Sequence, residues 1–172
     1  MTKKLILTMG ILGILFGCKS KANTADPQNG NDITLNTQQK MPEGRLLRVQ
    51  YFYQGMMMEE FGSFDLQRTS DGCKLSFRHF SSEVSYEVSD TLLDAARRII
   101  EQEKMYEYAS SYSLQMDDRI LDGYSWSFDA DFEGDEHISS GGRHVSPQGD
   151  GLYKISTLLS NAARQLVKAE NK

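Results

Sequence analysis

The stretch FGSFDLQRTSDGCKLSFRHF, residues 61–80, carries the clearest structural pattern in the chain. Phe64 and Leu66 alternate with polar neighbours in its first half, and Leu75 and Phe77 do the same in its second half. A period of two is typical of a strand with one buried face, and an Asp-Gly pair between two such runs is a strong signal for a hairpin. The stretch therefore predicts two antiparallel strands with their apolar side chains on one side.

The same alternation continues on both sides of this hairpin. A strand is expected before it, from about Arg45 to Met56, and another after it, from Glu83 to Val88, so that four strands form an antiparallel meander. A second group comprises Gly123–Phe132 and Glu136–Ser140, which are joined at Glu133-Gly134-Asp135. Aromatic and apolar residues occupy every second position before this turn, which indicates one buried and one solvated face. The sequence therefore predicts about six strands in two groups.

Each group of strands is followed by a segment with helical spacing. Apolar residues recur every three or four positions from Thr91 to about Tyr106, and again from Asp150, a plausible N-cap, to about Ala169. Such helices need an apolar surface to cover, and a sheet with one apolar face provides it. We therefore expect an α+β fold, in which an antiparallel sheet is packed on one face by two amphipathic helices.

The amino-terminal segment has the organisation of an export signal. Lys3-Lys4 precede an apolar run from Leu5 to Phe16, which is too short to span a bilayer as a helix. The run ends in Leu15-Phe16-Gly17-Cys18, which resembles the lipobox of bacterial lipoproteins. In that family the peptide is cut before the cysteine, the thiol receives a diacylglyceryl group and the new amino terminus is usually acylated. The resemblance implies that lipid at Cys18 holds the chain on a membrane.

This processing divides the chain into three expected parts. Residues 1–17 are the signal peptide, residues 18–40 are the lipidated cysteine with a flexible polar tether, and residues 41–172 are a single α+β domain. The tether is rich in Asn, Thr, Gln and Lys, and it has too few large apolar residues to offset the entropy of ordering. An alternative for part of the tether is an added edge strand through Ile33-Thr34-Leu35.

The charge balance and the cysteines limit the classes of partner and of cross-link. The chain carries 24 Asp and Glu against 19 Lys and Arg, a formal net charge of −5. Nucleic acid is not an expected partner, because its binding needs clusters of basic side chains and the sequence has none. Lipidation of Cys18 leaves Cys73 as the remaining thiol, so no intramolecular disulfide is expected. We interpret Cys73 as buried and inert.

Four carboxylates surround the expected turn of the second hairpin. Asp129, Asp131, Glu133 and Asp135 offer hard oxygen ligands at alternate positions around a glycine, as at the start of an EF-hand calcium loop. The twelfth position of such a loop needs a bidentate glutamate, and Ser140 occupies it here. The four acids are therefore candidates for weak cation binding, and the favoured interpretation is a solvated acidic face of a hairpin.

Two histidines form a second candidate metal site. His137 and His144 flank a Gly-Gly pair, and a turn there can bring their rings together. A zinc site also needs a third ligand, such as Asp135 or His79. Nothing in the spacing requires these groups to converge, so scattered surface histidines are the favoured interpretation.

Two further segments have the composition of adaptable binding surfaces. Met56-Met57-Met58 offers flexible, polarisable side chains at the end of a predicted strand. Tyr106, Tyr108 and Tyr112, together with Ser110, Ser111 and Ser113, form an aromatic and polar connector after the first helix, as in recognition loops. In both cases the favoured interpretation is structural: the methionines partly cover the core, and the tyrosines lie over the sheet.

Motifs for catalysis and for bound cofactors do not occur in the sequence. It contains no Gly-x-Ser-x-Gly elbow, no phosphate-binding loop, no His-Glu-x-x-His helix and no paired-cysteine metal motif. We therefore expect a non-catalytic binding or protein-interaction module, with no cofactor beyond the covalent lipid and with an envelope protein as candidate partner. The alternatives are a cation- or carbohydrate-binding lipoprotein that uses the acidic hairpin, and an envelope hydrolase with two catalytic carboxylates.

The residues after the lipidated cysteine bear on which membrane holds the chain. In some bacteria an aspartate at that position retains a lipoprotein at the inner membrane. Lys19-Ser20 follows the cysteine here, and neither residue is an aspartate. The expected location is therefore the cell envelope, with the outer membrane preferred over the inner membrane.

Overall fold

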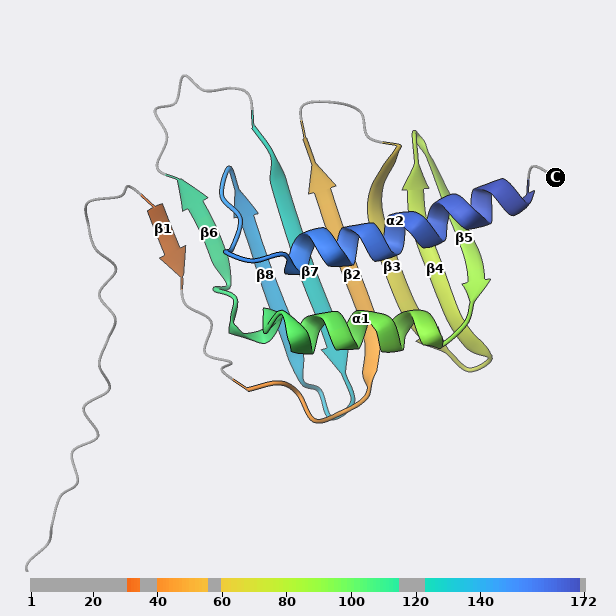
Figure 1. Ribbon diagram of the computed structural model, residues 1–172, viewed down its shortest axis with the longest axis horizontal. Coiled ribbons are helices and arrows are strands. Elements are labelled where there is room, and N and C mark those ends of the chain that lie inside the picture. Colours follow the sequence, from red (N-terminus) through yellow and green to blue (C-terminus); the bar gives the residue numbers. More distant parts are fainter. Residues whose placement is uncertain (1–30, 35–39, 56–59, 115–122, 171–172) are drawn as a thin grey trace, which may run out of the picture.

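The computed structural model describes residues 31–34, 40–55, 60–114 and 123–170. In this part of the chain, eight strands form one layer, and two helices that run across the strands form the other (Figure 1). Both helices cover the same face of the sheet, as the sequence predicts, and no helix covers the opposite face in the described part. The α+β class is confirmed.

The elements alternate along the chain as two groups of strands, each followed by a helix. The strands are β1 (Asn31–Thr34), β2 (Leu46–Gln54), β3 (Phe61–Thr69), β4 (Gly72–His79), β5 (Ser82–Val88), β6 (Ser111–Leu114), β7 (Ser125–Phe132) and β8 (His137–Arg143). The helices are α1 (Thr91–Gln102), the short 3-10 helix η1 (Met105–Glu107) and α2 (Gly151–Glu170). Across the sheet the order is β1-β6-β8-β7-β2-β3-β4-β5. The meander β2–β5 therefore occupies one end of the sheet, and β1 forms the edge at the other end.

The predictions of about six strands and of a wholly antiparallel sheet are wrong. The two additional strands, β1 and β6, are four residues long, which is too short for an alternating pattern to stand out in the sequence. β6 pairs with β8 in parallel, whereas the other strand pairs are antiparallel. A parallel neighbour requires a crossover connection rather than a tight turn, and the segment between β6 and β8 contains all of β7.

Part of the expected tether belongs to the sheet. Asn31–Thr34 pairs with β6 in antiparallel register, with Ile33 opposite Tyr112. The edge-strand alternative is confirmed at Ile33 and Thr34, whereas the strand begins earlier, at Asn31, and Leu35 lies outside the described residues. This strand pairs the backbone hydrogen-bonding groups on the outer side of β6. The lipobox, Cys18 and the rest of the tether up to residue 30, together with residues 35–39, lie outside the described residues.

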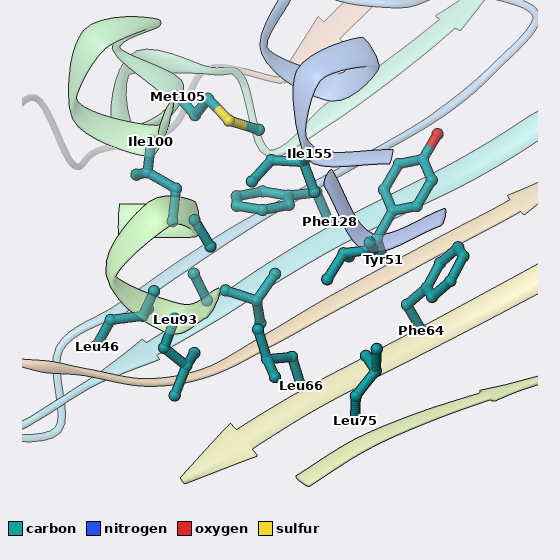
Figure 2. Close-up of a cluster of buried hydrophobic side chains, with 14 of the residues drawn as sticks. Leu46, Tyr51, Phe64, Leu66, Leu75, Leu93, Ile100, Met105, Phe128 and Ile155 are labelled. Carbon is teal, nitrogen blue, oxygen red and sulfur yellow. The ribbon is translucent and has the colours of Figure 1, made fainter. Parts of the chain in front are cut away.

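The core lies between the sheet and the helices (Figure 2). From the strands it takes the residues that alternate with polar ones, including Val49, Leu66, Leu75, Phe128 and Ile138, all buried. From the helices it takes one stripe each: Leu93, Ala96 and Ile100 in α1, and Ile155, Leu159 and Ala163 in α2. Removing this much apolar surface from water is the main source of stability for a chain without disulfides.

The ends of the helices differ in part from the prediction. α1 ends at Gln102 rather than near Tyr106, because Lys104 adopts a left-handed backbone conformation that starts η1. Asp150 does precede α2, and its carbonyl accepts the first intrahelical bond from Lys154. Within the described residues, no helix combines the length and the apolar character that a membrane crossing requires.

The Gly-Gly pair lies inside a strand and does not form the expected turn. β8 continues past Ser140 to Arg143, and Gly142 lies opposite Trp126 of β7 on one side and Tyr112 of β6 on the other. A Cβ atom on Gly142 would collide with the indole of Trp126 and with a backbone carbonyl. The glycine therefore leaves room for two aromatic rings, whose centroids lie 5.8 Å apart.

Candidate functional site

The acidic hairpin lies where the sequence predicts it, and its first two carboxylates have protein partners. Asp129 and Asp131 are on the face of β7 that carries no helix. The Ser139 hydroxyl donates to Oδ1 of Asp129 at 2.7 Å. Nδ1 of His137 lies 2.7 Å from Oδ1 of Asp131. Both carboxylates thus have partners on β8, and each uses its Oδ1 atom for that contact.

The other two acids of the hairpin point to different places. Glu133 forms an ion pair with Arg45, whose Nε lies 3.2 Å from Oε1 of the glutamate. Asp135 is in the turn itself, with φ at 61°. In the described part of the chain, no group of three or more histidine, cysteine, aspartate or glutamate side chains is arranged to hold a metal ion. The four candidate cation ligands therefore do not converge.

The histidines do not converge either. His137 and His144 lie at opposite ends of β8, because the intervening residues are extended. The ring of His144 occupies the space beside Gly123 and packs edge-on against Tyr124, with centroids 6.4 Å apart. His79 stacks on Phe61 in another part of the sheet. The predicted zinc site thus lacks its convergent geometry.

The helix-free face of the sheet is polar and contains a shallow hollow of about 280 Å³. Arg48 and Asp65 form a two-pronged ion pair at this face, with Nε of the arginine 2.8 Å from Oδ1 of the aspartate. Phe52 is half-buried among polar neighbours in the hollow, and Glu83 and Asp129 contribute carboxylates. This face is a second candidate surface for a polar ligand.

A larger cleft lies on the other face, where the first half of α2 crosses the ends of β2, β3 and β7. Its volume is about 360 Å³. Five aromatic side chains from the sheet line it: Tyr51, Tyr53, Phe61, Phe64 and Trp126. Figure 2 shows the ring of Tyr51 directed from β2 towards α2, beside Ile155. We call this space the aromatic cleft.

The aromatic floor of the cleft is held in place by its neighbours. Nε1 of Trp126 donates to the carbonyl of Val145 at 2.7 Å, which satisfies the one polar atom of a nearly buried indole. The ring of Tyr53 stacks on that of Tyr124, with centroids 5.9 Å apart. The Tyr124 hydroxyl in turn lies 3.3 Å from Oγ of Ser146 at the rim. A floor fixed in this way is preorganised for binding.

The wall of the cleft comes from α2 and from the segment that leads into it. Tyr153 lines the cleft although 71% of its surface is exposed. Ser156 and Ser160 follow on the same side of the helix, and the Ser156 hydroxyl donates to the carbonyl of Tyr153 at 3.0 Å. Gly149, at φ +99°, forms the rim with no atom within 4 Å of the position of a Cβ. The mouth of the cleft is therefore open to solvent.

The lining of the aromatic cleft is uncharged. Among the described residues that form it, none is Asp, Glu, Lys, Arg, His or Cys. Its polar groups are hydroxyls from tyrosines and serines and the backbone near the two glycines. Such a lining can bind a ligand by apolar contact and by neutral hydrogen bonds.

The sequence contained a partial signal for this cleft. The alternation in the sequence places Tyr51, Tyr53, Phe64 and Trp126 on the apolar face of their strands, but it does not place Phe61 there, because a register shift lies between Phe61 and Phe64. Period-two alternation does not distinguish a side chain in the core from one under the open end of a helix. The cleft was therefore not predicted.

The other residues singled out in the sequence have structural roles. The thiol of Cys73 is buried, and burial together with a hydrogen bond to Asp90 raises its pKa to about 11. Tyr108 is also buried, which raises the pKa of its hydroxyl to about 12. The Tyr112 hydroxyl accepts the backbone N–H of Ala109 at 2.9 Å. The tyrosine connector thus packs on the sheet, while Met57 and its two neighbours lie outside the described residues.

Comparisons with protein-family models, with curated proteins and with solved structures find no match to this chain. No ligand, activity or partner can therefore be transferred from a relative. The functional argument depends on the chemistry of the aromatic cleft and of the amino-terminal segment.

Proposed function

We propose that this chain is a lipid-anchored binding module of the bacterial cell envelope, preferentially at the outer membrane. Lipid at Cys18 provides the attachment, the polar segment after it provides reach, and the folded domain provides the binding site. The aromatic cleft is that site. The proposal makes the protein a non-catalytic receptor for a ligand presented in the envelope.

The uncharged lining of the aromatic cleft is the observation that carries this proposal. A concave, mostly apolar site with a few polar groups is the usual form of a ligand pocket, and its volume of about 360 Å³ lies in the range of about 300–1,000 Å³ typical of such pockets. An enzyme site of the same size needs a positioned acid, base or nucleophile beside the substrate. The described lining offers tyrosine and serine hydroxyls with no histidine or carboxylate to activate them.

The alternatives receive less support from the geometry. A cation-binding hairpin needs free carboxylates that converge, whereas Asp129 and Asp131 bond to Ser139 and His137. An envelope hydrolase needs two carboxylates that flank a substrate. The acid-bearing hollow on the helix-free face is smaller, and its Asp65 is engaged by Arg48.

Crosslinking in living cells tests the proposal. A tagged, anchored copy is crosslinked and the captured molecules are identified by mass spectrometry, with Cys18→Ala as the unanchored control. We expect a molecule that is enriched with the anchored form and lost when Tyr153→Ala alters the mouth of the cleft. Turnover of an envelope substrate by the purified protein, abolished by one carboxylate substitution, would show instead that the chain is a hydrolase.

A further inference from the structure

We propose that the aromatic cleft binds a neutral carbohydrate, with sugar rings laid against the accessible rings of Tyr53 and Tyr153. This inference rests on the proposed function, since it names the ligand class of that same site. It also moves the carbohydrate alternative from the acidic hairpin to the opposite, helix-covered face of the sheet. Three properties of the cleft carry the inference: its charge, the mixture of groups in its lining, and its open mouth.

The absence of charge selects against ionic ligands. The chain as a whole carries 43 charged side chains of the four strongly ionised types among 172 residues, because it has 24 acidic and 19 basic ones. The described lining of the cleft contains none of them. Phosphates and carboxylates are normally bound by Arg, Lys or helix N-termini that supply charge-assisted hydrogen bonds. The amino terminus of α2 borders the cleft, and the Arg164 guanidinium lies 5.7 Å from the centroid of the Phe61 ring, but no charged side chain belongs to the described lining, which favours an uncharged ligand.

The lining combines flat apolar faces with neutral hydroxyls. Tyr53, which is half-buried, and Tyr153, which is exposed, present aromatic surface, and Ser146, Ser156 and Ser160 lie in the same lining. A pyranose ring has the complementary composition, with C–H groups on its faces and hydroxyls around its edge. The C–H faces can stack on aromatic rings, and each ring hydroxyl can both donate to and accept from a serine. Ser146 and Ser156 already have hydrogen-bond partners within the protein, whereas a purely aliphatic ligand would offer none to Ser160, at a cost in affinity.

The mouth of the cleft extends the aromatic surface outward. Tyr153 is among the most exposed large apolar side chains in the described part of the chain, and it stands on α2 beside the opening. A chain of sugars that leaves the cleft would pass over this ring. The geometry thus fits an oligosaccharide better than a single sugar.

The chain contains its own reporter for the test. Trp126 is the one tryptophan in the sequence, and it forms part of the cleft floor. The full chain with Cys18→Ser, which cannot be lipidated, is titrated with oligomers of N-acetylglucosamine, of β-linked glucose and of α-linked glucose while tryptophan fluorescence is recorded. We expect a saturable change with at least one neutral series and a higher affinity for longer oligomers. Matched oligomers that carry carboxylates or sulfates are expected to bind at least tenfold more weakly.

Variants place the ligand in the cleft. Tyr153→Ala removes an exposed ring and should raise Kd about tenfold, since stacking contributes roughly 1 kcal/mol or more. Ser160→Ala removes one hydroxyl and should raise Kd about fivefold. Phe80→Ala is the matched control, because Phe80 is an exposed aromatic residue in the β4–β5 turn and does not line the cleft. Its Kd should equal that of the parent chain.

The possible results separate the two proposals. If no neutral oligosaccharide changes the fluorescence or is retained on immobilised protein, the carbohydrate inference is overturned. If Tyr153→Ala and Ser160→Ala both bind as the parent does, its location in the cleft is overturned. A partner protein captured in cells and lost in Tyr153→Ala, together with no sugar binding, overturns the carbohydrate inference while the binding-module function stands. A chain that binds neither sugars nor a captured partner refutes both.

Discussion

The thiol of Cys73 donates a hydrogen bond to Oδ1 of Asp90 at 3.2 Å. This contact joins the start of β4 to the residue before α1, and Arg68 of β3 forms an ion pair with the same carboxylate. The bond from Cys73 and then the ion pair with Arg68 lower the pKa of Asp90. The Asp90 side chain therefore connects β3, β4 and the start of α1, and it makes no hydrogen bond that caps the helix.

Cys73 should be unreactive in the folded protein. With its pKa raised from 9.0 to about 11, mainly by burial, the thiol stays protonated at pH 8, and the thiolate is the reactive form. In the Cys18→Ser chain, alkylation by iodoacetamide at pH 8 should be at least about a hundredfold slower in buffer than in denaturant. Equal rates in the two conditions would contradict this placement of the thiol.

The same thiol should reduce stability at alkaline pH. The unfolded thiol ionises near pH 9.0, and the folded one near pH 11, so stability is full below pH 9.0 and falls as the pH rises towards 11. Thermal unfolding midpoints of the parent and of Cys73→Ala should converge over this interval. Parallel pH profiles for the two proteins would show that the thiol does not titrate as proposed.

Asp90→Asn should destabilise the protein at neutral pH. The lowered pKa of Asp90 means that its carboxylate stabilises the fold above the ordinary value of 3.8, and that this contribution is lost as the pH falls through the lower, folded value. The difference in denaturation midpoint between Asp90→Asn and the parent should therefore be present at pH 7 and shrink in acid. Asp71→Asn, in the exposed turn of the first hairpin, is the control, and its denaturation midpoint should equal that of the parent at pH 7 and in acid.

Gly142→Ala should destabilise the fold by about 1–3 kcal/mol, because an added methyl group overpacks the contact between β8 and the Trp126 indole. Gly141→Ala is the neighbouring control: its Cβ would lie 3.3 Å from the nearest backbone oxygen, so the cost should be smaller. Urea denaturation measures the free energy of unfolding of both variants. An unchanged free energy of unfolding in Gly142→Ala would mean that the Trp126 indole can move away at no energetic cost.

Phe128→Ala should cost about 3–5 kcal/mol, because its ring is fully buried beneath the helices and truncation leaves a cavity. Phe80→Ala should change stability by less than about 0.5 kcal/mol, since 56% of that residue is exposed. The two substitutions remove the same ring from opposite environments. Similar losses of unfolding free energy in the two variants, measured in denaturant, would contradict the placement of Phe128 on the buried face.

Calcium should leave the unfolding temperature unchanged, because the carboxylates of Asp129 and Asp131 are engaged by Ser139 and His137. Thermal unfolding with millimolar calcium or with a chelator measures this. A ligand that binds only the folded state raises the midpoint, and the rise grows with the logarithm of its concentration above Kd. A saturable rise with calcium that disappears in Asp131→Ala would restore the cation-binding alternative.

Much of the fold could be predicted because the strongest signals are local. β3 has the predicted bounds, and the observed bounds of β4, β5 and β7 each differ from the predicted ones by one or two residues. In each case alternation over seven or more residues marked both the strand and its buried face. The same is true of the stripes of α1 and α2, although Lys104 ended the first helix early by adopting a left-handed conformation.

The candidate site was less predictable, since it depends on residues far apart in the chain. Asp129 and Asp131 were correctly placed on a solvated face, but their partners Ser139 and His137 follow from the register of β7 with β8. The Gly-Gly pair was interpreted as a turn because glycine is common in turns. It lies in a strand because Gly142 has to leave space between Tyr112 and Trp126.

The sequence by itself determined the secondary structure of the long elements, the face that each one buries and the resemblance to lipoproteins around Cys18. Only the tertiary structure decided the order of the strands, the parallel pairing of β6 with β8, the addition of β1 and the position of the aromatic cleft. The physical reason is that periodicity encodes which side of an element avoids water. The neighbours of that side are chosen by packing and backbone pairing between segments that are distant in the chain.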